Sequence, residues 1–120
     1  ANLADEIAYN TSDLDDGLRS DVLRLEDVAQ LTLWQDALRS LGLSEVTHLD
    51  HLLRARIIRR LVSFEINDAI QATAEKLARH NIRSVADLRD HGENVARFSV
   101  AMERKNRQLK AFLMEKFYHH

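Results

Sequence analysis

Apolar residues recur every three or four positions along most of the chain, which is the period of an amphipathic helix. In the first segment, four aliphatic side chains fall within about 60° of one another on a helical projection: Leu3, Ile7, Leu14 and Leu18. No stretch shows the alternation of apolar and polar residues that is typical of a half-buried strand. The pattern therefore predicts an all-α fold.

Start and stop signals divide this pattern into a bundle of four to five helices. Gly42 is suited to end the second helix in a left-handed conformation. Thr47 and Asp50 have the spacing of a capping box that opens the third helix. Ser84 and Asp87 repeat that spacing for a short helix that ends near residue 92. The other expected ranges are about 1–18, 25–41, 49–80 and 99–118.

The composition agrees with a single helical domain over residues 1–120. The chain has no proline, three glycines and 45% apolar residues. It also lacks cysteine, which excludes disulfides and cysteine-ligated zinc and favours the cytoplasm. A formal net charge of −2 argues against nucleic-acid binding, and no apolar run is long enough to predict a membrane helix.

An acidic row lies opposite the aliphatic stripe of the first helix. Its members cluster within about 80° on the helical projection: Asp5, Tyr9, Asp13 and Asp16. Residues 1–21 hold six acids and one base, so repulsion between carboxylates one turn apart is not offset by lysines. Two interpretations follow, a solvated acidic face or a row that meets a cation or a ligand rich in hydroxyl groups.

The stretch ADEIAYNTSDLDDGL, residues 4–18, resembles the last metal-ligand helix of the dGTP triphosphohydrolase family, within the HD-domain superfamily. RARIIRRLVSFEINDAI (54–70) and LKAFLMEKFYHH (109–120) resemble later segments of the same family. The resemblance implies a divalent metal ion, such as Mg²⁺ or Mn²⁺, with Asp5 as one of its ligands. It also implies that Tyr9 and Asp13 contact the deoxyribose of a deoxynucleoside triphosphate. Enzymes of this family release intact triphosphate and the deoxynucleoside, and the resemblance implies a homo-oligomer.

The family's other metal ligands, a histidine and a His-Asp pair, lie upstream of this helix. No His-Asp dipeptide occurs in the 120 residues. We therefore expect the chain to be a C-terminal-side portion of such an enzyme, without hydrolytic activity by itself. Two alternatives stay open: a helical interaction module without chemistry, and a nucleotide or metal sensor that does not hydrolyse its ligand.

Four arginines stand within seven residues of the third predicted helix, at positions 54, 56, 59 and 60. One interpretation is a basic flank whose members pair with nearby acids. The other assigns Arg56 and Arg60 to the triphosphate, because guanidinium groups match phosphate oxygens. Arg56 and Arg60 share one side of that helix with Ser63 and Asn67, within about 60°.

Overall fold

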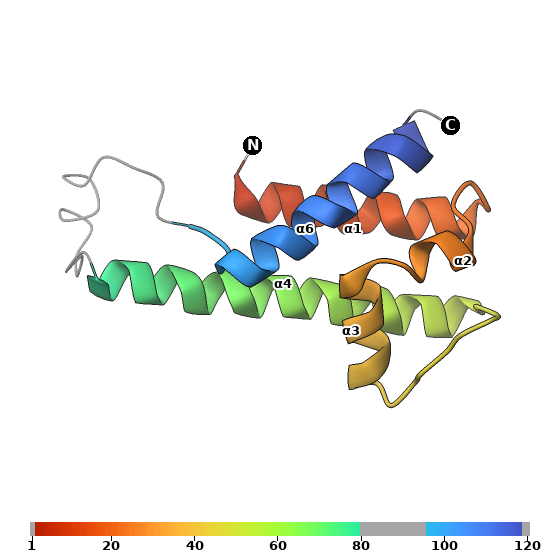
Figure 1. Cartoon of the computed structure of the whole chain (residues 1–120), viewed down its shortest axis with the longest axis horizontal. Helices are drawn as coiled ribbons and strands as arrows, with labels where there is room; N and C mark the ends of the chain where they lie inside the picture. The colour runs from red at the N-terminus through yellow and green to blue at the C-terminus, as the bar shows by residue number, and fades with distance from the viewer. Residues whose placement is uncertain (1, 80–95, 119–120) are drawn as a thin grey trace.

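The computed structural model describes residues 2–79 and 96–118. Within these ranges the chain forms helices and no strand (Figure 1). The helices are α1 (Leu3–Arg19), α2 (Leu25–Val28), α3 (Thr32–Ser40), α4 (His51–Arg79) and α6 (Val100–Leu113), followed by the π-helical turn η1 (Met114–Tyr118). The predicted all-α fold is confirmed. The short helix predicted from Ser84 onward lies outside the described residues.

Helix α4 is the longest element, and α1 packs along it (Figure 1). Helix α6 runs obliquely over α1 and also contacts α3, which in turn lies across α4. The core fills the space where these four helices meet. Its largest fully buried apolar side chains come from each of them: Leu14, Leu33, Trp34, Ile57, Leu61, Leu109 and Leu113. None of the described helices has the length and apolar character that crossing a membrane requires.

Helix α1 confirms the first predicted helix to within two residues at each end. Its amide at Asp5 donates to the side chain of Asn2 at 2.9 Å, which caps the start. The aliphatic stripe faces the core, with Ile7, Leu14 and Leu18 buried and Leu3 packed against them. The opposite side, which carries the acidic row, is thereby turned outward.

The second predicted helix, 25–41, is wrong as a single element, because the structure breaks it into α2 and α3. On one straight helix, the apolar residues of this range would be spread around the whole circumference. The break between Val28 and Thr32 lets Val28, Leu31 and Trp34 all face the core. The amide of Thr32 is held by the side chain of Gln108 on α6, with N···O at 2.8 Å.

The end of α3 agrees with the predicted stop. Gly42 has φ 76°, and its amide donates to Arg39 O at 3.1 Å. The amide of Leu43 donates to Leu38 O at 2.8 Å, which completes a Schellman motif. Glycine is favoured at position 42 because the left-handed conformation is less favourable for a residue with a Cβ.

The starts of α4 and α6 are set by side-chain caps. The carboxylate of Asp50 accepts from the amide of Leu53 at 2.7 Å, so Asp50 caps α4 and the predicted cap at Thr47 is wrong. The reason is geometric, because Asp50 directly precedes the first helical residue whereas Thr47 lies in the preceding connection. Ser99 caps α6 by accepting from the amide of Met102 at 3.2 Å, as the predicted start at residue 99 requires.

Candidate functional site

The acidic row follows the outer side of α1. The side chains of Asp5 and Tyr9 are exposed, Tyr9 by 65%, and that of Asp13 is half-buried. Successive members are about 6 Å apart along the axis, because four residues of helix rise by that distance. Within residues 2–79 and 96–118, the Asp5 carboxylate makes no hydrogen bond or ion pair. The row thus presents one unpaired carboxylate and one exposed phenol to a ligand.

Asp13 meets a partner from the far end of the chain. The hydroxyl of Tyr118 donates to Asp13 Oδ2. This hydrogen bond raises the pKa of Tyr118 above its ordinary value, because it favours the neutral phenol. Phe117 packs edge-on to Tyr118, with ring centroids 5.3 Å apart. The sequence interpretation did not include Tyr118 in the site, although its segment was among those that resemble the family.

The remaining acids of the second half of α1 are held by arginines. Arg54 Nε donates to Asp15 Oδ1 at 2.9 Å, and the Arg54 side chain is only 12% exposed. Asp16 pairs with Arg19 at 2.7 Å on the surface. Arg54 therefore fits the interpretation of a basic flank paired with acids, since its guanidinium joins α4 to α1.

The other three arginines of the cluster lie elsewhere. Arg56, Arg59 and Arg60 line a hollow of about 390 Å³ with Leu41, at the end of α3, and Ser63. In the part of the chain that the structure describes, their guanidinium groups have no ion-pair partner. No member of the acidic row lines this hollow, so within this chain the structure does not bring Arg56 and Arg60 to the row.

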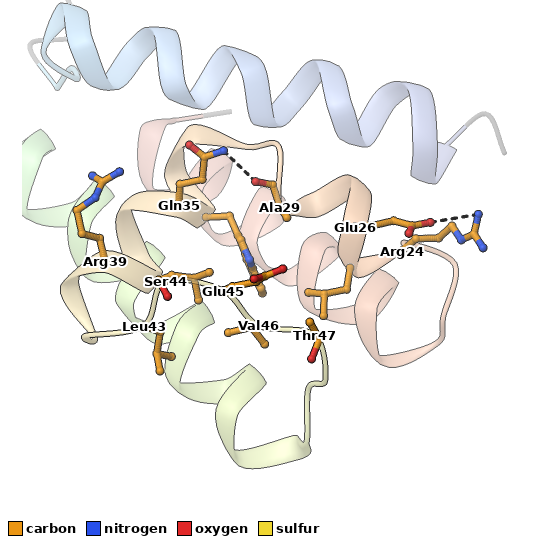
Figure 2. Close-up of a pocket in the computed structure, with 13 residues that line it drawn as sticks. Arg24, Glu26, Ala29, Gln35, Arg39, Leu43, Ser44, Glu45, Val46 and Thr47 are labelled. Carbon is orange, nitrogen blue, oxygen red and sulfur yellow. Dashed lines mark hydrogen bonds and ion pairs between the residues drawn. The ribbon is translucent and has the colours of Figure 1, made fainter.

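A larger hollow, of about 930 Å³, lies between α2, α3 and the connection that follows α3 (Figure 2). Trp34 is among its lining residues. Arg24 and Glu26 form an ion pair at its rim at 3.4 Å, and Gln35 Nε2 donates to Ala29 O at 2.9 Å (Figure 2). Arg39 pairs with Asp36, which does not line the hollow, and no residue of the acidic row lines it.

A buried carboxylate that the sequence interpretation missed lies in α4. Glu65 is fully buried, and neither of its oxygens has a hydrogen-bond partner within the described residues. Burial, followed by the nearby charges of Glu6 and Asp68, raises its pKa to about 7. Its burial could have been predicted from its position in the helix. Glu65 lies one turn after Leu61 and two turns after Ile57, on the side that faces the core.

The described residues do not form a complete metal site. Across residues 2–79 and 96–118, no group of three or more His, Asp or Glu side chains could together hold an ion. A carboxylate oxygen such as that of Asp5 suits Mg²⁺ or Mn²⁺, but these ions need several ligands. Asp5 can therefore act as one member of a ligand set and not as a site by itself.

Comparison with known proteins agrees with the motif on α1. The chain is 34% identical over 119 residues to a deoxyguanosinetriphosphate triphosphohydrolase-like protein of Geobacter sulfurreducens, covering 99% of the chain and 31% of that protein. It is 40% identical over 124 residues to such a protein of Allorhizobium ampelinum, covering all of the chain and 30% of that protein. The predicted family resemblance is confirmed. No protein-family model matches the chain.

The match covers the whole chain but a minor share of each relative. A third relative, from Parvibaculum lavamentivorans, is 38% identical over 125 residues and is covered to 30% of its length. The chain thus spans about a third of the length of the curated relatives it matches. The comparison therefore establishes sequence similarity over this segment. The activity in the relatives' names refers to those longer proteins.

Proposed function

We propose that the chain is the C-terminal-side portion of a metal-dependent deoxynucleoside triphosphate triphosphohydrolase. The observation that carries the proposal is the row on α1, where an unpaired carboxylate at Asp5 precedes an exposed Tyr9 and a half-buried Asp13. The relatives that bear this activity in their names match the chain over its full length, which supports the same assignment. The complete protein would cleave its substrate to the deoxynucleoside and triphosphate.

Asp5 would bind the metal ion at one end of the row. The described residues supply this one ligand, so the others must come from parts of the protein beyond them. When held by a full set of ligands, a divalent ion acts as a Lewis acid on phosphoryl oxygens and on water. For this chain alone we expect no turnover.

Tyr9 and Asp13 would hold the sugar further along the helix. A carboxylate that accepts from a sugar hydroxyl makes a charge-assisted hydrogen bond, and a phenol can both pack on the ring and donate. Because an ionised carboxylate accepts about four hydrogen bonds, the bond from Tyr118 leaves Asp13 capacity for a sugar hydroxyl. The bond from Tyr118 also restrains the Asp13 side chain.

Arg56 and Arg60 are proposed as triphosphate contacts of the assembled protein. They point away from the helix face that packs on α1, where Ile58 and Val62 lie. A nucleotide at the acidic row of the same chain would therefore lie on another side of the molecule. The proposal accordingly requires a homo-oligomer in which these arginines meet the triphosphate bound to a neighbouring copy.

The test uses the full-length protein and four single variants. Asp5→Asn should lose bound metal and triphosphate release together, because the charge of one ligand is removed. Asp16→Asn, on the same helix and paired only with Arg19 in an exposed ion pair, is the matched control and should retain both. If Asp5→Asn keeps full activity, the proposal fails and the non-catalytic interaction module is favoured.

The two sugar contacts are separated from the metal ligand by the same assays. Asp13→Asn and Tyr9→Phe should both keep the metal. The neutral hydrogen bond of Tyr9 contributes about 0.5–1.5 kcal/mol, and loss of the bond to the charged Asp13 costs about 1.5–3 kcal/mol. The loss at Asp13 corresponds to roughly ten- to a hundredfold in kcat/KM. Equal loss of metal from both variants and from Asp5→Asn would instead mean that the whole row surrounds the ion.

A further inference from the structure

An apolar groove of about 900 Å³ runs between α1 and α4, which lie side by side in Figure 1. Helix α1 lines it with small residues one turn apart, Ala4, Ala8 and Ser12, and also with Leu3, Ile7, Thr11 and Asp15. Helix α4 lines it with branched aliphatic residues at the same spacing, 58, 62, 66 and 70. The small residues on the α1 side would let the backbone of another segment approach closely. The row of aliphatic side chains at 58, 62, 66 and 70 forms a ridge along the α4 side.

Ile58 and Val62 are half-buried against the core, whereas the later part of the ridge is exposed. Ile66 is 43% and Ile70 is 64% exposed, although both lie on the aliphatic side of α4. A contiguous apolar surface of this kind typically marks a site where another polypeptide packs. An amphipathic helix lying in such a groove is an established way of burying it, with apolar side chains spaced three or four residues apart.

We propose that the groove is the docking surface for an apolar-faced helix from the part of the protein beyond this chain. The inference rests on the proposed function in one respect, that the chain is a portion of a longer protein. The relatives are about three times as long as the segment they share with it, so ample chain is available to fill the groove. The residues of α4 that line the groove run from Ile58 to Leu77, about 28 Å along the helix, which matches a docked helix of about five turns.

The groove borders the acidic row directly. Ala4 and Ala8 immediately precede Asp5 and Tyr9, so the two surfaces are adjacent sides of α1. A helix seated in the groove would run beside the row, from which its side chains could reach Asp5. The docking surface thus also explains how a second segment would be brought to a carboxylate that has no partner among the described residues.

The test measures the accessibility of single cysteines. The chain contains no cysteine, so Ile70→Cys and Leu52→Cys each introduce one maleimide target into it. Leu52 is 73% exposed, lies on the same helix and is outside the groove, which makes it the matched control. Peptide mapping by mass spectrometry would compare labelling rates in the 120-residue chain and in the full-length protein.

In the chain alone, both positions should react rapidly. In the full-length protein, labelling of Ile70→Cys should slow by at least about tenfold, since a docked helix must open before the reagent enters. Labelling of Leu52→Cys should keep its rate. Unchanged labelling of Ile70→Cys, or equal slowing at both positions, would overturn the proposal.

Two further readouts separate the alternatives. If the chain alone forms a dimer in sedimentation and Ile70→Cys is already protected there, the occupant is a second copy and the proposal is overturned. Triphosphate release, measured on the full-length wild-type protein, separates docking from catalysis. Protection in a protein without triphosphohydrolase activity would support the docking surface and refute the proposed function, whereas activity with a reactive Ile70→Cys would do the reverse.

Discussion

Replacing Glu65 with glutamine should make the chain more stable at neutral and alkaline pH. The side chain is fully buried on α4, and neither oxygen has a hydrogen-bond partner among the described residues. Burial raises its pKa from 4.5 to about 7, with Glu6 and Asp68 adding to the effect. The folded state therefore holds a proton that the unfolded chain releases more readily.

The sign of the pH dependence follows from this difference. Below the unfolded pKa of 4.5, Glu65 is neutral in both states and carries no penalty. Between 4.5 and about 7 the unfolded chain ionises first, so the free energy of unfolding falls as the pH rises. Above about 7 the carboxylate is charged in both states, and the accumulated loss reaches about 3 kcal/mol at about 1.4 kcal/mol per pKa unit.

The effect can be measured by urea unfolding followed by circular dichroism. Measurements from pH 5 to pH 8 cover both sides of the pKa of about 7. Glu65→Gln should be more stable than the wild type by less than about 1 kcal/mol at the acidic end and by up to about 3 kcal/mol at the alkaline end. Glu75→Gln, at an exposed position of the same helix, should follow the wild-type curve. If the difference between Glu65→Gln and wild type does not change with pH, the argument from burial is refuted.

Three shorter predictions concern activity, packing and the Tyr118 contact. The 120-residue chain should release no triphosphate from any dNTP, and metal-dependent release that Asp5→Ala abolishes would contradict this. Gly17→Ala should lower the free energy of unfolding by about 1 kcal/mol, because a Cβ there would overlap the buried Leu23 and outweigh the gain in helix propensity; urea unfolding measures it. In a spectrophotometric titration, Tyr118 should ionise above its ordinary pKa of 10.0, and Asp13→Asn should return it toward that value.

The helices that the sequence predicted well are those whose local signals agree with their packing. In α1 the aliphatic stripe and the acidic side are separated by periodicity alone, and the structure keeps that division. Gly42 could be recognised as a stop because a left-handed residue favours glycine. The break between Val28 and Thr32 carries no proline or glycine, so no local signal marks it. It arises from tertiary packing, in which Leu31 and Trp34 reach the core together.

The same distinction applies to the candidate site. Asp5, Tyr9 and Asp13 could be proposed because they lie on one helix in a motif that resembles a known family. The residues that bond to the acids of α1 could not be predicted in this way, because they come from distant parts of the chain. Asp15 is bonded by Arg54, 39 residues away, and Asp13 is bonded by a tyrosine 105 residues away. Such pairs depend on how the helices cross, which periodicity does not specify.

Asp5 should be far more important for activity than for stability. It lies in the first turn of α1, where a negative charge interacts favourably with the helix dipole, typically by about 0.3–1 kcal/mol. Its backbone amide, and not its carboxylate, takes part in the cap with Asn2, so Asp5→Asn leaves that hydrogen bond intact. In the 120-residue chain, this variant should therefore lower the free energy of unfolding by no more than about 1 kcal/mol. In the full-length protein, the same change should remove bound metal and triphosphate release. A large loss of stability in the chain alone would show that the carboxylate has a structural role, and loss of activity could then no longer be assigned to metal binding.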